Sequence, residues 1–239
     1  MLNALQNELI INNGVLKSNG KIAYVPQKPV LMEGSSIRAN IVLGSVYDPQ
    51  RYDRVIWICQ LRGVFTHYNL GDFSKVGDKH VNLSESIQYR IQLASALYSN
   101  ADIYLIDNIW QVFNNKICKQ IWQKAIIEFL KDKTRIVVTS NLPNLNDMDN
   151  ILYLKAGTIK LEGSIDKIRI ENDYLEFVKF AKDVNLLDTV SIKDILDNYV
   201  NIEDTENCNE EIKSAGRKKA IIESKRTEKP NLRNQLDNF

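Results

Sequence analysis

The chain has 239 residues, 44% of them hydrophobic and 26% charged, and 31 basic residues nearly balance 30 acidic ones. This composition is ordinary for a globular protein, and the near-zero net charge argues against nucleic acid as a partner. The apolar runs are far shorter than the roughly 18–20 residues that cross a bilayer, and no signal peptide is expected. Three widely spaced cysteines indicate reduced thiols in a cytosolic setting.

The first part of the chain predicts two helices with a strand between them. Apolar residues recur at helical spacing over residues 2–10, with no capping residue ahead of them. Residues 21–25 are typical of a strand, which Pro26 ends. Asp48 followed by Pro49 predicts the N-cap and first residue of a second helix.

The middle of the chain predicts a buried parallel sheet. Residues 71–82 show no periodicity and are expected to form an exposed loop, after which Ser84 is expected to cap a helix. The apolar run 103–106 ends in Asp107, and a second run covers 135–139, with a helical pattern between them. Strands that are apolar throughout and alternate with helices are typical of parallel sheets, so the predicted fold class is α/β.

The last part of the chain changes character. Residues 151–161 predict a hairpin, and Ser164 and Ser191 are expected to cap two further helices. Residues 201–239 are polar, first largely acidic and then largely basic, which predicts a disordered tail.

Several segments, in this order, resemble the nucleotide-binding domain of ABC transporters. They are 20–27, 36–41, 76–84, 94–107 and 131–139. The third and fourth look most like the first such domain of the multidrug-resistance-associated (C) subfamily. The resemblance covers about residues 1–170 and implies a partial P-loop ATPase (RecA-like) core with the ABC helical subdomain. Residues 171–200 are then expected to be C-terminal helices, and 201–239 a linker.

The resemblance implies nucleotide-binding roles for three residues. Gln27 stands where the family's glutamine contacts Mg²⁺ and the γ-phosphate and relays their presence to the membrane domain. Asp107 stands at the Walker B aspartate, which holds Mg²⁺ through water, as suits a cation that keeps its own waters. Ser84 stands at the signature serine, which faces ATP held by a partner domain. Without the resemblance, Asp107 is better explained as a helix cap, and a polar strand end explains Gln27 equally well.

The phosphate-binding motif of this class is absent from the sequence. Binding of the phosphates needs G-x-x-x-x-G-K-[ST], whose backbone N–H groups and lysine hold them. The nearest match, between Gly14 and Lys21, has one residue too many between its glycines and leads into a strand. We therefore expect the chain to lack the Walker A segment and the N-terminal β-subdomain that the family carries ahead of the position of Met1.

Other positions that the family uses in hydrolysis are changed too. Glu85 replaces the first signature glycine, which suits a first helical turn but brings negative charge near phosphate. Asn108 stands at the position of the general base, and an amide cannot accept a proton from water. Ser140 replaces the switch histidine, and Asn114 replaces the D-loop aspartate. We therefore predict no catalytic residue and impaired hydrolysis.

The function expected from the resemblance is coupling of ATP binding to transmembrane transport, once the missing parts are supplied. Whether the chain is an enzyme stays open, since the family hydrolyses ATP but this chain alone is expected to be inactive. The expected cofactors are ATP and Mg²⁺, bound weakly or not at all by the isolated chain. The expected partners are ABC transmembrane domains and a second nucleotide-binding domain, at the cytoplasmic face of a membrane, although the isolated chain is expected to be soluble.

Two alternatives remain open at this point. The first is a non-catalytic interaction module that pairs with an intact ABC domain without binding nucleotide. The second is a soluble ABC ATPase without membrane partners, against which the likeness to the C subfamily counts.

Overall fold

We describe residues 1–139, 147–171, 174 and 177 of a computed structural model of the chain. The chain divides into two compact units, Met1–Leu187 and Asp188–Phe239, and every described residue belongs to the first. The helix expected after Ser191 and the tail expected over 201–239 therefore lie outside the described residues.

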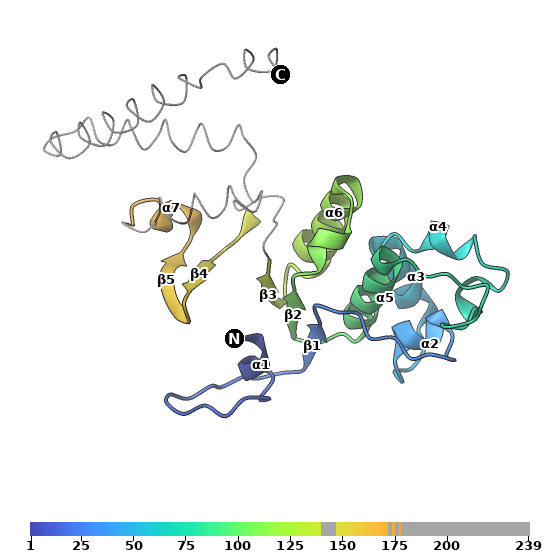
Figure 1. Ribbon diagram of the computed structural model, residues 1–239, viewed down its shortest axis with the longest axis horizontal. Coiled ribbons are helices and arrows are strands. Elements are labelled where there is room, and N and C mark those ends of the chain that lie inside the picture. The colour runs from blue at the N-terminus through green and yellow to red at the C-terminus, as the bar shows by residue number, and fades with distance from the viewer. Residues whose placement is uncertain (140–146, 172–173, 175–176, 178–239) are drawn as a thin grey trace, which may run out of the picture. The chain divides into compact units, whose positions relative to one another are not determined.

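A three-stranded parallel sheet carries the core (Figure 1). Its strands, in spatial order, are β1 (Ile22–Val25), β2 (Ile103–Asp107) and β3 (Thr134–Val138). The register pairs Val25 with Ile106 and Asp107 with Val138, so the carboxyl ends of all three strands lie at one edge. The predicted parallel strands and the mixed α/β class are confirmed.

The central strand is the most buried of the three. In β2, the side chains of Leu105 and Ile106 are 0% exposed, and Tyr104 is 1% exposed. This burial explains why the strand is apolar throughout, because both faces of a central parallel strand pack against other parts of the fold.

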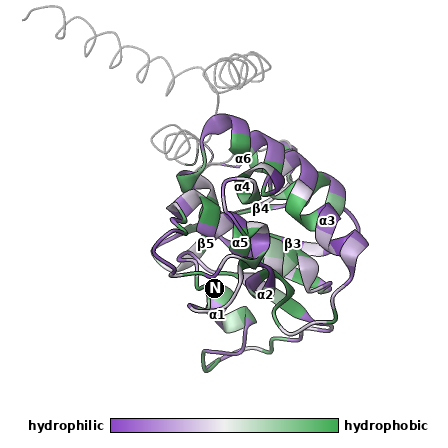
Figure 2. Cartoon of the chain, turned by 90° about the vertical axis from the view of Figure 1, so that its right-hand side faces the viewer, coloured by the Kyte–Doolittle hydropathy of each residue, from purple (hydrophilic) through white to green (hydrophobic). Residues whose placement is uncertain are grey.

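Helical segments fill the connection from β1 to β2. They are α2 (Ile37–Val42), α3 (Pro49–Ile58), α4 (Arg62–Phe65), η1 (Gly71–Phe73) and α5 (Glu85–Tyr98). The Asp48 carboxylate accepts hydrogen bonds from the N–H groups of Gln50 and Arg51, so the predicted cap of α3 is confirmed. Figure 2 shows both hydrophilic and hydrophobic residues along α3, as expected of an amphipathic helix that packs on α5.

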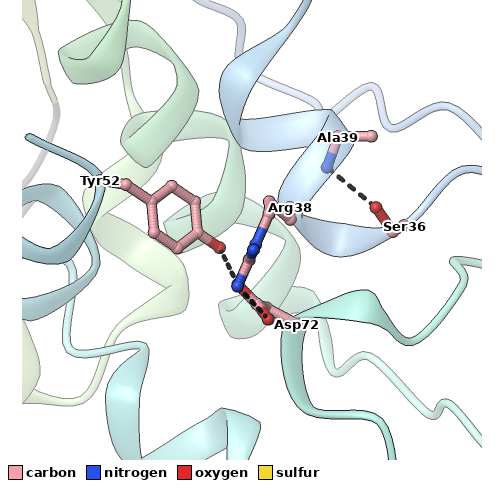
Figure 3. A network of polar contacts seen from close by, with 5 residues as sticks. All are labelled: Ser36, Arg38, Ala39, Tyr52 and Asp72. Carbon is pink, nitrogen blue, oxygen red and sulfur yellow. Dashed lines mark hydrogen bonds and ion pairs between the residues drawn. The ribbon is translucent and has the colours of Figure 1, made fainter. Parts of the chain in front are cut away.

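The prediction of an exposed loop over 71–82 is wrong for its first residues. Asp72 is only 9% exposed, because its carboxylate accepts a hydrogen bond of 2.6 Å from the Tyr52 hydroxyl and pairs with Arg38 (Figure 3). The Arg38 guanidinium also lies over the ring of Phe73, 4.0 Å from its centroid. This polar cluster ties η1 to α2 and α3. No periodic pattern in the sequence predicts it.

The first helix is shorter than its apolar pattern predicted. Helix α1 covers only Leu2–Leu5, and Asn7 then takes a left-handed conformation with φ of 61°. A residue in this conformation ends a helix, and Asn accepts it more readily than most residues. Leu9 and Ile10 are consequently 53% and 93% exposed rather than part of a buried face.

The connection from β2 to β3 is also helical. It comprises η2 (Ile109–Val112), α6 (Asn115–Ile121) and η3 (Trp122–Phe129), the last of which is a π-helix. Trp110 and Trp122 are buried and meet edge to face, with ring centroids 5.0 Å apart. This contact joins η2 to the start of η3.

The predicted hairpin is confirmed as β4 (Ile151–Lys155) and β5 (Thr158–Gly163), which pair antiparallel. Ala156 and Gly157 form its two-residue turn, both with positive φ, as the tight turns that match strand twist require. The short helix α7 (Ile165–Ile168) follows Ser164 as predicted, but the Ser164 side chain makes no capping hydrogen bond. Among the described residues, no helix has the length and apolarity needed to span a membrane.

Candidate functional site

Two of the predicted site residues lie at the carboxyl edge of the sheet. Asp107 is the last residue of β2, and Gln27 follows the end of the neighbouring strand β1 by two residues. Asp107 is half-buried and Gln27 is exposed. Ligands of open parallel sheets bind at this edge, so both residues stand where the fold class places its chemistry.

Tyr24 holds the Asp107 carboxylate in place. Its hydroxyl donates a hydrogen bond of 3.4 Å to Asp107 Oδ2, from β1 to the adjacent strand. Burial raises the pKa of Tyr24, and the negative charge of Asp107 raises it further, so the hydroxyl keeps the proton that it donates. A carboxylate can accept about four hydrogen bonds, so Asp107 retains acceptor positions for the water shell of a cation.

The segment around Gln27 is tied to α5 by two hydrogen bonds. The Tyr89 hydroxyl donates to the carbonyl oxygen of Gln27, and the N–H of Val30 donates to Gln92 Oε1 at 3.1 Å. Each bond spans 62 residues of sequence. Tyr89 and Gln92 are three residues apart and therefore share one helix face. The sequence did not identify either residue as part of the site, because their spacing predicts a shared helix face but not the distant segment that this face contacts.

Ser84 lies on a different element from Gln27 and Asp107. It is the N-cap residue of α5 and is exposed, but its side chain makes no capping hydrogen bond, contrary to the expected cap. Glu85 is the exposed first residue of the helix. Burial of Tyr89 raises the pKa of its hydroxyl, and the negative charge of Glu85 raises this pKa further. The carboxylate of Glu85 thus acts on the residue that contacts the Gln27 segment.

The positions that depart from the family pattern have local structural roles. Asn108 follows β2 with φ of 49°, and its N–H donates to the carbonyl oxygen of Val138 at 2.8 Å. Asn114 is the N-cap of α6, where its side chain accepts a hydrogen bond of 2.9 Å from Ile117 N. Ser140 lies outside the described residues.

The described residues fit a magnesium ion better than they fit a triphosphate. They contain no cluster of three or more His, Cys, Asp or Glu side chains. Magnesium needs no such cluster, because it binds through one or two carboxylates and takes its other ligands from water and phosphate. The phosphates themselves need a glycine-rich loop with its lysine, and the sequence has none. The single carboxylate of Asp107 therefore suits a magnesium ion.

Comparison with known proteins decides the family. No family model matches the chain. The chain is 32% identical over 193 residues to ABC transporter C family member 9 of Arabidopsis thaliana, which covers 81% of the chain. It is 34% identical over 187 residues to ATP-binding cassette sub-family C member 4 of Mus musculus, covering 78% of the chain. The chain is a homologue of C-family ABC transporters.

A further C-family relative agrees with this. This chain is 36% identical over 166 residues to ATP-binding cassette sub-family C member 2 of Mus musculus, and the match covers 69% of the chain. The matched parts are 13%, 13% and 11% of the lengths of these three relatives. The resemblance to the C subfamily is thereby confirmed over most of the chain, and the chain matches a small part of each transporter.

Proposed function

We propose that this C-family homologue forms part of an ATP-binding domain that takes part in binding Mg²⁺ and ATP without hydrolysing ATP. In this proposal residues 1–170 are a partial P-loop ATPase core with its helical subdomain, lacking the Walker A segment and β-subdomain. Residues 171–200 are C-terminal helices and 201–239 a linker. Transmembrane domains and a second nucleotide-binding domain complete a transporter, with this chain at the cytoplasmic face of the membrane.

The observation that carries the proposal is the position of Asp107 at the carboxyl end of β2 and of Gln27 just beyond the carboxyl end of the adjacent strand β1. Asp107 would hold Mg²⁺ through water, and the hydrogen bond from Tyr24 orients its carboxylate for this. The bound ion would supply positive charge beside the phosphates. Gln27 would contact the same ion from the neighbouring strand.

The two hydrogen bonds from α5 support a coupling role for Gln27. A displacement of Gln27 toward a ligand pulls on the carbonyl oxygen that Tyr89 holds, and α5 also holds Val30 through Gln92. Since α5 packs against α2 and α3, a change at the sheet edge reaches the helical part of the chain through these contacts. This arrangement suits a domain that passes a binding event to a membrane partner.

The residues present support binding without hydrolysis. Asn108 offers no group that removes a proton from water. Glu85 places a carboxylate at the start of α5, next to Ser84, where the family brings phosphate close to the helix N-terminus. The like-charge contact there is expected to cost several kcal/mol unless the side chain turns away.

The charge of Glu85 is also the observation that favours a second candidate function. A chain that repels phosphate at α5 and has no phosphate loop suits an interaction module that pairs with an intact ABC domain and binds no nucleotide. The two candidates differ in one property, which is whether the chain binds nucleotide.

Titration of the 239-residue chain with a fluorescent ATP analogue, with and without Mg²⁺, separates the candidates. Our proposal predicts Mg²⁺-dependent binding with a Kd on the order of 1 mM, weakened about tenfold by Asp107→Ala. The matched control is Asp132→Ala, which removes an exposed carboxylate in the turn before β3 and should leave the Kd unchanged. Undetectable binding would favour the interaction module, and binding that is equally strong in both variants would contradict both candidates' account of Asp107 and nucleotide.

A further inference from the structure

Helix α3 and the π-helix η3 are joined by two cation–π contacts. In the first, Lys124 Nζ in η3 lies 3.7 Å from the ring centroid of Trp57 in α3. In the second, the guanidinium carbon of Arg54 in α3 lies 5.0 Å from the ring centroid of Phe129 in η3. Each helix thus contributes one cation and one aromatic ring. The two contacts join the connection from β1 to β2 with the connection from β2 to β3.

Aromatic rings, and not carboxylates, hold both of these cations. Neither cation forms a salt bridge with another residue in the part of the chain that the structure describes. The acidic side chains next to them in sequence have other partners, since Asp53 pairs with Arg62 and Glu128 accepts a hydrogen bond from Gln123. A cation over a ring is attracted by the negative face of the ring. The two ring contacts are therefore what fixes these cations in place.

The π winding of η3 turns Lys124 and Phe129 toward the same neighbour. The two residues are five positions apart in the π-helix. In an α-helix such residues point about 140° apart, because each residue turns the chain by about 100°. In a π-helix the hydrogen bonds join residues five apart, so these residues lie nearly one above the other. With α winding, only one of the two side chains would face α3.

Two further contacts in this segment follow the same five-residue spacing. The N–H of Leu130 donates to the carbonyl oxygen of Ala125 at 3.0 Å. On the side chains, Gln123 Nε2 donates to Glu128 Oε1 at 3.0 Å. Turns of this width are rare and are frequent at functional sites when they occur. Side chains of η3 itself therefore support the π winding, in addition to the contacts with α3.

The start of η3 is anchored, whereas its end is held by fewer contacts. Trp122 meets Trp110 edge to face, and its indole N–H donates to Asp147 Oδ2 at 3.3 Å. Lys124 is two residues from this anchor, and Phe129 is seven residues from it. A change of winding that leaves the anchor in place therefore displaces Phe129 much more than Lys124.

We propose that η3 is a latch for α3, closed by π winding and opened by α winding. In the closed state both cation–π pairs are formed and α3 is fixed against η3. In the open state Phe129 turns away from Arg54, and only the pair of Lys124 and Trp57 remains. The two states are discrete, because a helical hydrogen bond spans either four or five residues. Packed elements of this kind switch between arrangements and do not deform continuously.

The latch acts on the helices that reach the end of β1. Helix α3 packs against α5, and Tyr89 of α5 holds the carbonyl oxygen of Gln27. The anchor of η3 lies against η2, which follows β2. The winding of η3 therefore sets how firmly the helices between β1 and β2 are held to the segment after β2. The inference does not rest on nucleotide binding by the chain.

The test labels the full chain with 4-fluorophenylalanine and follows the fluorine NMR signal of Phe129. The chain has seven phenylalanines, and Phe129→Leu assigns the signal of interest. Arg54→Gln removes the cation over the ring, so it should shift this signal. The matched control is Arg62→Gln, which removes the cation of an exposed ion pair in α4 and should leave the signal in place.

Gln123→Ala separates a switch from a static contact. It removes the side-chain bond that supports the π winding, at a position six residues from Phe129. It should therefore shift the Phe129 signal in the same direction as Arg54→Gln. Gln120→Ala, in the preceding helix α6, is its control and should shift nothing. None of these four positions is buried, so all four variants should fold.

Hydrogen exchange of the backbone amides over residues 126–130 gives an independent measure of opening. Arg54→Gln and Gln123→Ala should each accelerate this exchange about threefold to fivefold, and the two controls should not. The proposal is wrong if Arg54→Gln leaves the Phe129 signal in place. It is equally wrong if Gln123→Ala leaves that signal and the exchange unaltered, because the π winding would then be static. Shifts of the same size in the controls would also overturn it.

Discussion

The hydroxyl of Tyr89 in α5 donates a hydrogen bond to the carbonyl oxygen of Gln27, which follows β1. Tyr89→Phe removes only this donor, so the segment from Gln27 to Val30 should exchange its amide hydrogens faster. The free energy of unfolding should fall by about 1 kcal/mol. Tyr68→Phe is the control, because Tyr68 makes the same kind of bond to the carbonyl oxygen of Asn82 at 3.0 Å. Faster exchange near Gln27 in the control as well would contradict a specific tie to α5.

Removal of the Asp72 side chain should destabilise the fold much more than removal of Asp53, an exposed carboxylate in an ion pair. Asp72→Ala leaves Arg38 and Tyr52 without their shared acceptor, at an expected loss of about 3 kcal/mol in the free energy of unfolding. Asp53→Ala breaks an ion pair with Arg62 in which both side chains are at least half exposed, so its loss should stay below about 1 kcal/mol. Urea denaturation measures both, and equal losses would show that the Asp72 cluster contributes no special stability.

Alkaline pH should reduce stability through Tyr52. Burial and the hydrogen bond to Asp72 raise the pKa of Tyr52 above its ordinary value of 10.0. The unfolded chain ionises this residue near pH 10 while the folded chain keeps it protonated, so the unfolded state binds fewer protons and stability falls as the pH rises above 10.

Comparison of two variants over this pH range isolates the effect. Tyr52→Phe should lose less stability than the unaltered chain between about pH 9 and pH 11, although it is less stable at neutral pH. Parallel stability curves for the two proteins would mean that Tyr52 does not ionise differently in the folded and unfolded states.

The thiol of Cys59 should be unreactive in the folded protein. Its side chain is 0% exposed, and burial raises its pKa, so both access and the thiolate fraction are low. In a Cys118→Ser, Cys208→Ser variant, a disulfide reagent at pH 8 should modify Cys59 only as fast as the chain opens, and denaturant should restore normal reactivity. Modification of the native variant at the rate of a free model thiol would be evidence against this buried environment.

The parallel sheet was predictable because its strands are encoded locally. Ile103 to Ile106 and Ile136 to Val138 are continuous apolar runs, and such runs separated by a helix have few other stable arrangements. The cap at Asp48 was predictable for the same reason, since the residues that it contacts lie two and three positions away. Asp107 was placed correctly at the end of its strand.

The features that sequence reasoning missed depend on contacts between distant segments. Asp72 is buried only because Arg38 and Tyr52 reach it from other helices, and the pattern around it resembles an ordinary polar loop. The tie from Tyr89 to Gln27 likewise joins residues that no periodicity connects. Helix α1 ended early because one residue, Asn7, takes a left-handed conformation that an apolar pattern does not reveal.

The most direct test of the account is ATP turnover by the purified 239-residue chain, measured as phosphate release in the presence of Mg²⁺. Asp107 is proposed to hold the metal, but the sequence has no glycine-rich loop for the triphosphate, and Asn108 cannot act as a base. We therefore predict no phosphate release above that of Asp107→Ala. Sustained release by the unaltered chain that Asp107→Ala abolishes and Asp132→Ala leaves intact would contradict it.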